Sequence, residues 1–84
     1  FEIVEIKSPK KVVNKTLGHI GLRENYELNL ITVKRTFEEK VQGKFQEVQH
    51  IVGVPHGDTL LYDTDILIIL GKHQNIARFV EINS

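Results

Sequence analysis

Residues 54–71 read VPHGDTLLYDTDILIILG, with three aspartates followed by a nearly unbroken apolar stretch. The run ILIIL at 66–70 has five β-compatible residues and no polar member. Such a run is typical of a strand at the centre of a sheet, buried on both faces. The Gly, Pro and Asp residues before it favour a loop. We therefore predict that a loop leads into a buried strand at 66–70.

Three further strands are predicted from apolar alternation and turn residues. One lies at 1–7 and is stopped by Ser8 and Pro9, and another lies at 28–35. The charged segment that follows contains Gly43, which predicts a hairpin turn and a return strand over 45–52. The chain should therefore form a sheet with a solvated hairpin tip.

Two helices are predicted from apolar residues at helical spacing. Val13, Leu17 and Ile20 lie at i, i+4 and i+7, which indicates a helix over 12–22 that ends near Gly21. A second spacing, i, i+3 and i+4, indicates a helix near the C-terminal end of the chain, at Ile76, Phe79 and Val80. The order strand, helix, three strands, helix is that of a small α+β domain.

Composition limits the class of protein. The chain has 84 residues, enough for one domain, with 11 basic and 11 acidic side chains and no net charge. A neutral chain lacks the positive field that holds a phosphate backbone, so DNA and RNA are not expected partners. No cysteine is present, which excludes disulfides and thiolate metal sites. We expect a soluble domain, and the missing Met at position 1 indicates a piece of a longer protein.

The aspartates of the opening stretch allow two interpretations. An EF-hand loop starting at Asp63 would need Gly at its sixth position, where Ile68 stands. Asp63 and Asp65 share a strand face and could serve a two-carboxylate hydrolase. Asp and Thr before an apolar strand are also ordinary turn formers, and we favour that role for Asp58, Asp63 and Asp65.

No other residues form a recognisable catalytic or metal-binding motif. The four histidines, at positions 19, 50, 56 and 73, show no helical i, i+4 pair, so we predict no metal site. His50 and His56 flank the Gly/Pro loop and are placed to contact a ligand there. Arg35 leaves a buried strand beside the hairpin and is the best candidate for an anion contact.

Two long stretches, NKTLGHIGLRENYELNLITVKR (14–35) and VPHGDTLLYDTDILIILGKHQNIARF (54–79), together resemble the C-terminal domain of RCK proteins, the TrkA-C domain. The positions that agree with the family pattern are Thr16, Leu17, Leu22, Arg23, Val33, Lys34, Arg35, Pro55, Asp58, Thr59, Leu61, Asp65, Leu67 and Gly71. Asn14 and Thr64 stand where the family has turn glycines, and many relatives lack the long 36–50 hairpin. In this hairpin the chain is more similar to the Ktr-type regulators of bacterial potassium uptake.

The resemblance implies a regulatory domain over residues 1–84 and no enzyme. Its parent protein would carry an N-terminal Rossmann-like domain and would lie in the cytoplasm, at the inner face of the membrane, bound to a potassium transporter subunit. The implied partners are a second copy in a two-fold homodimer, higher rings in the full-length protein, and the membrane-embedded subunit. The implied regulatory ligand is cyclic di-AMP, and no cofactor is implied.

A two-fold symmetric ligand on the axis of a dimer would use one set of residues twice. Adenine needs an apolar platform, which Leu30, Ile31, Val54 and Pro55 could supply. Taken singly, Leu30, Ile31 and Val54 are somewhat better explained as core or dimer-interface residues, since apolar strand residues mostly serve packing. Phosphate needs a fixed cation, for which we predict Arg35, with His50 and His56 second. Two other hypotheses stay open. The domain could be a dimerisation and coupling module of a transporter or antiporter without a nucleotide, or a small enzyme using Asp63 and Asp65.

Overall fold

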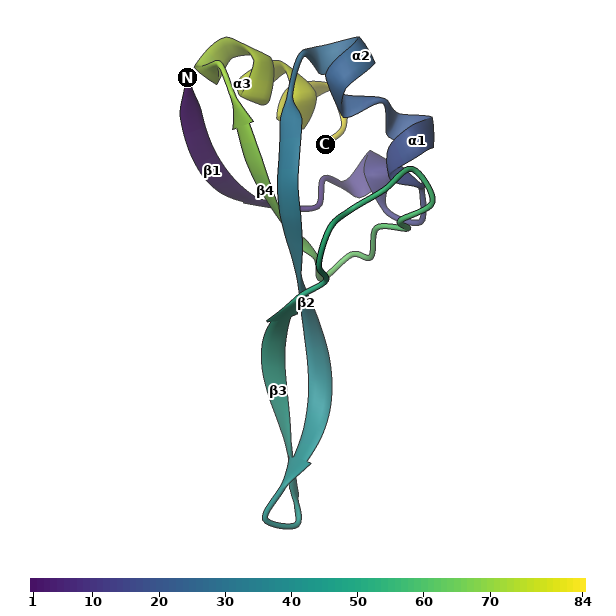
Figure 1. Ribbon diagram of the computed structural model, residues 1–84, viewed down its shortest axis with the longest axis vertical. Coiled ribbons are helices and arrows are strands. Elements are labelled where there is room, and N and C mark those ends of the chain that lie inside the picture. The colour runs from purple at the N-terminus through teal and green to yellow at the C-terminus, as the bar shows by residue number, and fades with distance from the viewer.

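The computed structural model describes all 84 residues as an antiparallel sheet with three short α-helices and a protruding hairpin (Figure 1). The elements are β1 (Glu2–Lys7), a 3-10 turn (Lys10–Val12), α1 (Leu17–Ile20), α2 (Leu22–Tyr26), β2 (Asn29–Val41), β3 (Lys44–Ile51), β4 (Ile66–Gly71) and α3 (His73–Ile82). The four strands lie in the order β1-β4-β2-β3. The predicted α+β class is confirmed. No helix is long and apolar enough to cross a membrane.

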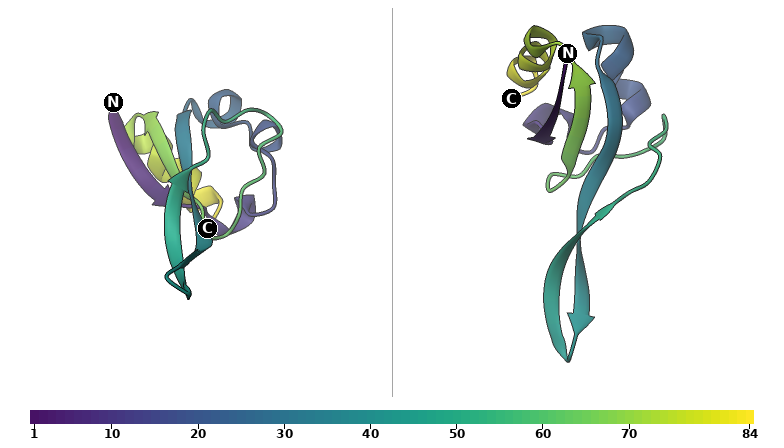
Figure 2. Two further views of the ribbon diagram at one scale, coloured as in Figure 1. Left: turned by 60° about the horizontal axis from the view of Figure 1, so that its bottom comes forward. Right: turned by 60° about the vertical axis from the view of Figure 1, so that its left-hand side comes forward.

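The predicted strand 66–70 is β4, which lies in the middle of the sheet between β1 and β2. Leu67 and Ile69 are fully buried on the side where the helices pack. Ile66, Ile68 and Leu70 point to the other side and are only half buried. The expectation of burial on both faces is therefore wrong for one face, because the helices gather on the opposite side (Figure 2).

The core joins this inner face of the sheet to the helices. Phe79 of α3 is completely buried and its ring meets Tyr26 of α2 edge to face, with centroids 5.1 Å apart. The predicted closing helix is confirmed as α3. The ten buried hydrophobic residues are Val12, Ile20, Leu22, Leu28, Val33, Leu61, Leu67, Ile69, Ile76 and Phe79.

β2 continues from the predicted strand at 28–35 through the charged segment to Val41, so that it forms one arm of the predicted hairpin. Its pairing with β4 shifts between Leu30 and Thr32, so that a β-bulge leaves Ile31 unpaired. The bulge breaks simple alternation and turns both Leu30 and Val33 toward the core. The predicted turn is confirmed, since Gln42 and Gly43 have positive φ (51° and 78°) and connect β2 to β3.

The predicted helix over 12–22 is wrong in its first half. The chain makes one 3-10 turn and bends at Asn14, and α1 begins after Thr16, whose hydroxyl accepts a hydrogen bond from the N–H of His19 (3.3 Å). Gly21 ends α1 as predicted, because it is left-handed (φ 63°). α2 follows immediately. It was not predicted, because its polar segment has no apolar residues at helical spacing.

Asn14 has a left-handed backbone (φ 66°), at a position where the family that the sequence resembles has glycine. Asn tolerates this region better than most residues. We expect Asn14→Gly to change the free energy of unfolding by less than about 0.5 kcal/mol, whereas Asn14→Val lowers it by about 1–2 kcal/mol. Urea denaturation measures both. Equal stability of the two variants would mean that the backbone at residue 14 is not left-handed.

Candidate functional site

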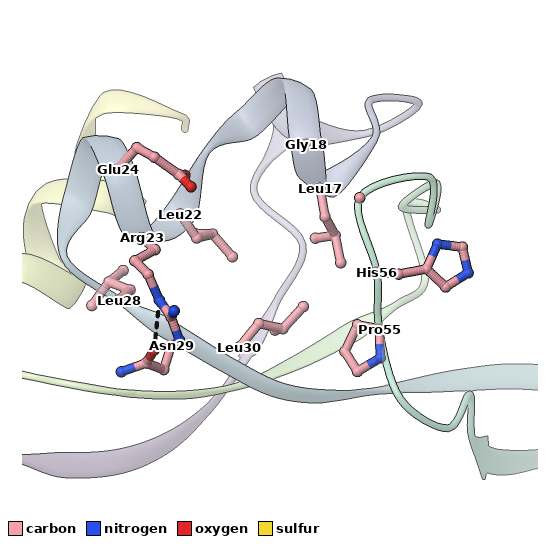
Figure 3. Close-up of a pocket in the computed structure, with 11 residues that line it drawn as sticks. Leu17, Gly18, Leu22, Arg23, Glu24, Leu28, Asn29, Leu30, Pro55 and His56 are labelled. Carbon is pink, nitrogen blue, oxygen red and sulfur yellow. Dashed lines mark hydrogen bonds between the residues drawn. The ribbon is translucent and has the colours of Figure 1, made fainter.

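A hollow of about 420 Å³ lies between α1, α2, the start of β2 and the loop that follows β3 (Figure 3). Figure 3 shows Leu17, Leu22 and Leu30 directed toward one another, with Arg23 on one side and Pro55 on the other. The remaining lining residues are Gly18, Glu24, Leu28, Asn29, His56 and Gly57. Small-molecule sites are usually lined mostly by apolar side chains with a few polar groups. Here four leucines share the lining with four polar side chains, Arg23, Glu24, Asn29 and His56, so the hollow offers both an apolar platform and hydrogen-bonding groups.

The 53–57 loop that closes this hollow is held by backbone hydrogen bonds. The N–H of Gly18 donates to Gly57 O (2.9 Å). Thr32 Oγ1 on β2 donates to Gly53 O (2.9 Å). A Cβ on Gly18 would lie 3.1 Å from Gly57 O, so this close approach of α1 to the loop favours glycine. The loop is therefore fixed at both ends against the body.

Arg23 is the cation of this hollow. Its Nε and one terminal nitrogen donate to Asn29 Oδ1 at 3.2 and 2.8 Å, and no carboxylate lies within ion-pair distance of it. Arg23 was predicted only as a position that agrees with the family pattern, without a role in a site. One signal for such a role was present in the sequence, because Arg23 is a cation in the polar segment between the predicted helix over 12–22 and the predicted strand at 28–35.

Arg35, the predicted phosphate contact, does not line this hollow and makes a bidentate ion pair. Its Nε and NH2 donate to the two carboxylate oxygens of Asp65 at 2.9 and 2.8 Å, and NH2 also donates to Leu60 O (2.7 Å). The guanidinium stacks 3.9 Å from the ring centroid of Tyr62. NH1 makes no hydrogen bond within the chain and is not fully buried, so it can still donate to an anion.

The hydrogen bonds to Asp65 raise the pKa of the Arg35 guanidinium above its ordinary value, against the lowering effect of burial. A cation whose pKa is raised by folding contributes its full stabilisation below its unfolded pKa and loses it only as the pH rises through the higher folded pKa. Arg35 is therefore a fixed cation through the physiological range.

His50 lies across the hairpin from Arg35. Its Nε2 is 2.7 Å from Glu39 Oε1, and its ring packs against Phe37 with centroids 5.8 Å apart. A second hollow, of about 560 Å³, opens here at the base of the hairpin. Its lining residues are Arg35, Phe37, Glu38, Glu39, His50, Ile51 and Val52.

The seven predicted ligand residues are thus divided in one copy of the chain. Leu30, Pro55 and His56 line the first hollow, and Arg35 and His50 line the second. The other two, Ile31 (44% exposed) and Val54 (90% exposed), line neither hollow and project into solvent.

His56 contributes less to the first hollow than its position suggests. Its ring points away from the leucines (Figure 3), and its Nδ1 accepts a hydrogen bond from the N–H of Asp58 (3.3 Å). Asp58 was the predicted turn former of this loop. Instead Thr59 Oγ1 accepts from the N–H of His56 (3.1 Å).

The other two aspartates occupy different environments. Asp65 is fully buried, and besides Arg35 it accepts a hydrogen bond from the N–H of Tyr62 (2.8 Å), which confirms it as a turn former. Asp63 is exposed and makes no hydrogen bond. Neither lines any hollow, so the two carboxylates do not face the common pocket that the hydrolase hypothesis requires. No three His, Asp or Glu side chains gather as a metal site would need.

Comparison with known proteins agrees with this architecture. The family model described as the TrkA-C domain matches residues 1–83. A solved structure, the RCK C domain of the potassium transport protein KtrA in complex with cyclic diadenosine monophosphate (c-di-AMP), superimposes with a TM-score of 0.72 at 27% identity, over 96% of this chain and 81% of that one. The K⁺/H⁺ antiporter subunit KhtT of Bacillus subtilis (strain 168) is 20% identical over 80 residues. This match covers 95% of the chain but only 42% of KhtT. The chain belongs to the TrkA-C domain family.

Proposed function

We propose that this chain is the ligand-sensing domain of a cytoplasmic regulatory subunit of a potassium transporter, and that it binds c-di-AMP between two copies of itself. The observation that carries the proposal is the leucine-floored hollow beside Leu30 and Pro55, in a chain whose fold matches a domain solved with c-di-AMP. The role is regulatory, without catalysis and without a cofactor.

The adenine is assigned to the first hollow. Its volume, about 420 Å³, lies within the range of small-molecule pockets. Leu17, Leu22 and Leu30 supply an apolar platform, and Pro55 supplies a rigid wall at its edge. Ile31 and Val54, which are exposed beside this hollow, are assigned to the surface that the second copy covers.

The phosphates are assigned to Arg35 and, within the first hollow, to Arg23. Arg35 retains a free NH1 edge beside its pair with Asp65. Hydrogen bonds from a guanidinium to a phosphate are about twice as strong as neutral ones. Because Arg35 is already held in place by Asp65 and Tyr62, little side-chain entropy is lost when it binds an anion.

A ligand held by two copies controls a transporter only through differential affinity. If c-di-AMP binds one arrangement of the dimer more tightly, it shifts the subunit toward that arrangement. The whole parent protein, with its Rossmann-like domain and its transporter subunit at the cytoplasmic face of the membrane, would transmit the shift.

Titration of c-di-AMP into the chain tests the proposal. Calorimetry should show saturable heat with one ligand per two chains, and ligand at about 100 times Kd should add about 2.7 kcal/mol to the stability. Leu30→Glu buries a carboxylate in the platform and should abolish the heat. Val41→Glu, at an exposed residue near the hairpin tip, is the control and should bind normally. Absence of heat from the native chain at high micromolar ligand would reject c-di-AMP sensing.

A second function is favoured by one observation. The Nε and NH2 groups of Arg35 already bind Asp65, so the best cation for a phosphate has a structural partner within the chain. One similar protein is a K⁺/H⁺ antiporter subunit. The domain would then only dimerise and couple its parent to a cation transporter or antiporter. Under this alternative, sedimentation would show the same dimer with and without c-di-AMP and no stabilisation by it.

A further inference from the structure

The sheet has two free edges, because β1 and β3 are its outermost strands. The β1 edge carries three charged side chains, Glu2, Glu5 and Lys7. Charged side chains on an edge strand oppose its pairing with another chain. β3 reads KFQEVQHI, with a single Lys at its first residue, no Pro and no β-bulge. Of the two edges, the β3 edge therefore lacks the usual protection against pairing.

No other strand of the chain pairs with the outer side of β3. The hairpin projects from the body and accounts for the 45 Å length of a molecule that is only 24 and 23 Å across (Figures 1 and 2). Phe45 is 73% exposed and Ile51 is 61% exposed, and both point to one face because an even number of positions separates them. A lone two-stranded ribbon is marginally stable in water at best, so a further strand on this edge would stabilise it.

The backbone groups that β3 directs outward belong to alternate residues. The N–H of Val52 donates to Val33 O on β2 (2.9 Å). Opposite residues in an antiparallel pair alternate between hydrogen-bonded and non-hydrogen-bonded pairs. Residues 44, 46, 48 and 50 therefore bond to β2, and residues 45, 47, 49 and 51 direct their N–H and C=O groups away from it. A further antiparallel strand would pair with these outward groups.

A second copy of β3 matches this edge in one arrangement. Two antiparallel copies of a strand are related by a two-fold axis normal to the sheet, and the residue on the axis faces its own mate. With the axis at Val48, Phe45 lies opposite Ile51 of the second copy. Glu47 then lies opposite Gln49. An axis at Glu47 would place two glutamates opposite each other, and an axis at Gln49 would place Glu47 opposite Ile51. Only the Val48 axis joins the two exposed apolar residues and keeps the like charges apart.

The other face of the ribbon agrees with the same axis. Phe37 pairs with Val48 within the chain, so the axis extends this pair into an apolar row that crosses both copies. In the next row, His50 lies opposite Gln46 of the second copy, so no like charges lie opposite each other across the axis on this face either. Both faces of β3 are therefore complementary to a second β3.

We propose that the β3 edge is a docking surface for a second copy of this chain, which joins the two four-stranded sheets into one. A chain with this contact is a dimer before any ligand binds. The inference goes beyond the proposed function and does not rest on it, because no ligand takes part. The hollow beside Leu30 and Pro55 shares no lining residue with β3.

Oxidative crosslinking tests the position of the axis. The chain has no cysteine, so a single Val48→Cys substitution can form a disulfide only between two copies. Cα atoms of a non-hydrogen-bonded antiparallel pair are about 4.5 Å apart, within the range of about 4.4–6.8 Å that a disulfide needs. Gln46→Cys is the matched control, because it lies on the same face but opposite His50 of the second copy. We expect Val48→Cys to crosslink much faster than Gln46→Cys, and equal rates overturn the inference.

Sedimentation equilibrium tests the edge itself. Gln49→Pro removes an outward N–H and none that bonds to β2, a position at which an edge strand accepts Pro. By symmetry the dimer loses two hydrogen bonds, so its dissociation constant should rise at least about 30-fold. Gln49→Ala removes the same side chain, keeps the N–H and should dimerise like the native chain.

Two results of this experiment overturn the inference. One is a native chain that stays monomeric at millimolar concentration. The other is a Gln49→Pro variant that is folded by circular dichroism and dimerises like the native chain. If Gln49→Pro does not fold, the comparison of Val48→Cys with Gln46→Cys decides. Neither test uses c-di-AMP, so a failure here is distinct from a failure of ligand sensing.

Discussion

Replacing Asp65 by alanine is expected to lower the free energy of unfolding by about 3–5 kcal/mol, a large part of the stability of a domain this size. Asp65 has no exposed surface, and its two oxygens accept hydrogen bonds from Arg35 and from the N–H of Tyr62. The substitution leaves the Arg35 guanidinium largely buried without its partner and the N–H of Tyr62 without an acceptor. Chemical denaturation followed by circular dichroism measures the loss.

Asp63→Ala is the matched control, because the residue type is the same, it lies two positions away and its side chain is exposed. Its unfolding free energy should stay within about 0.5 kcal/mol of the native value. If both variants lost several kcal/mol, the buried ion pair would not be the cause. If neither did, Asp65 would not be paired in solution. The comparison also bears on the enzyme hypothesis, which needs both carboxylates to be free for chemistry.

The strands of this fold could be predicted from sequence because their signals are local. The run ILIIL predicts a central strand, although not which of its faces the helices cover, and Gly43 predicts the hairpin turn. The two short helices could not, because their ends depend on the backbone: Asn14 and Gly21 are left-handed, and Thr16 caps α1. The apolar spacing over 12–22 continues through these turns, so it does not show where the helices begin and end.

Some residues that line the candidate site could be predicted from the sequence, but not which of them lie together. Leu30 and Pro55 were expected to form one apolar platform, and they line one hollow. The pairing of Arg35 with Asp65, thirty residues away in the sequence, depends on the register between β2 and β4, which no local pattern reports. Arg23 was missed as a site residue for the same reason, since only the fold brings α2 over the start of β2.

A charge-free replacement of the Arg35–Asp65 pair is expected to restore most of the stability lost in Asp65→Ala and still weaken c-di-AMP binding about 10- to 100-fold. The double variant Arg35→Met/Asp65→Asn removes both charges together and keeps an amide oxygen to accept the N–H of Tyr62. Replacing both members of a buried pair often changes stability little, so the free energy of unfolding should stay within about 1–2 kcal/mol of the native value. Denaturation and calorimetry on one preparation measure both effects.

This variant separates the two roles of Arg35, which Arg35→Ala cannot do, since an unpaired buried Asp65 would damage the fold and the site together. The control is Lys34→Met/Glu5→Gln, which neutralises the neighbouring exposed pair (Nζ to Oε1 2.6 Å) and so makes the same change in charge. This control should lower the free energy of unfolding by less than about 1 kcal/mol and leave the affinity for c-di-AMP unchanged. A stable Arg35→Met/Asp65→Asn variant that binds c-di-AMP like the native chain would make Arg35 a structural residue only and would assign the phosphate to Arg23.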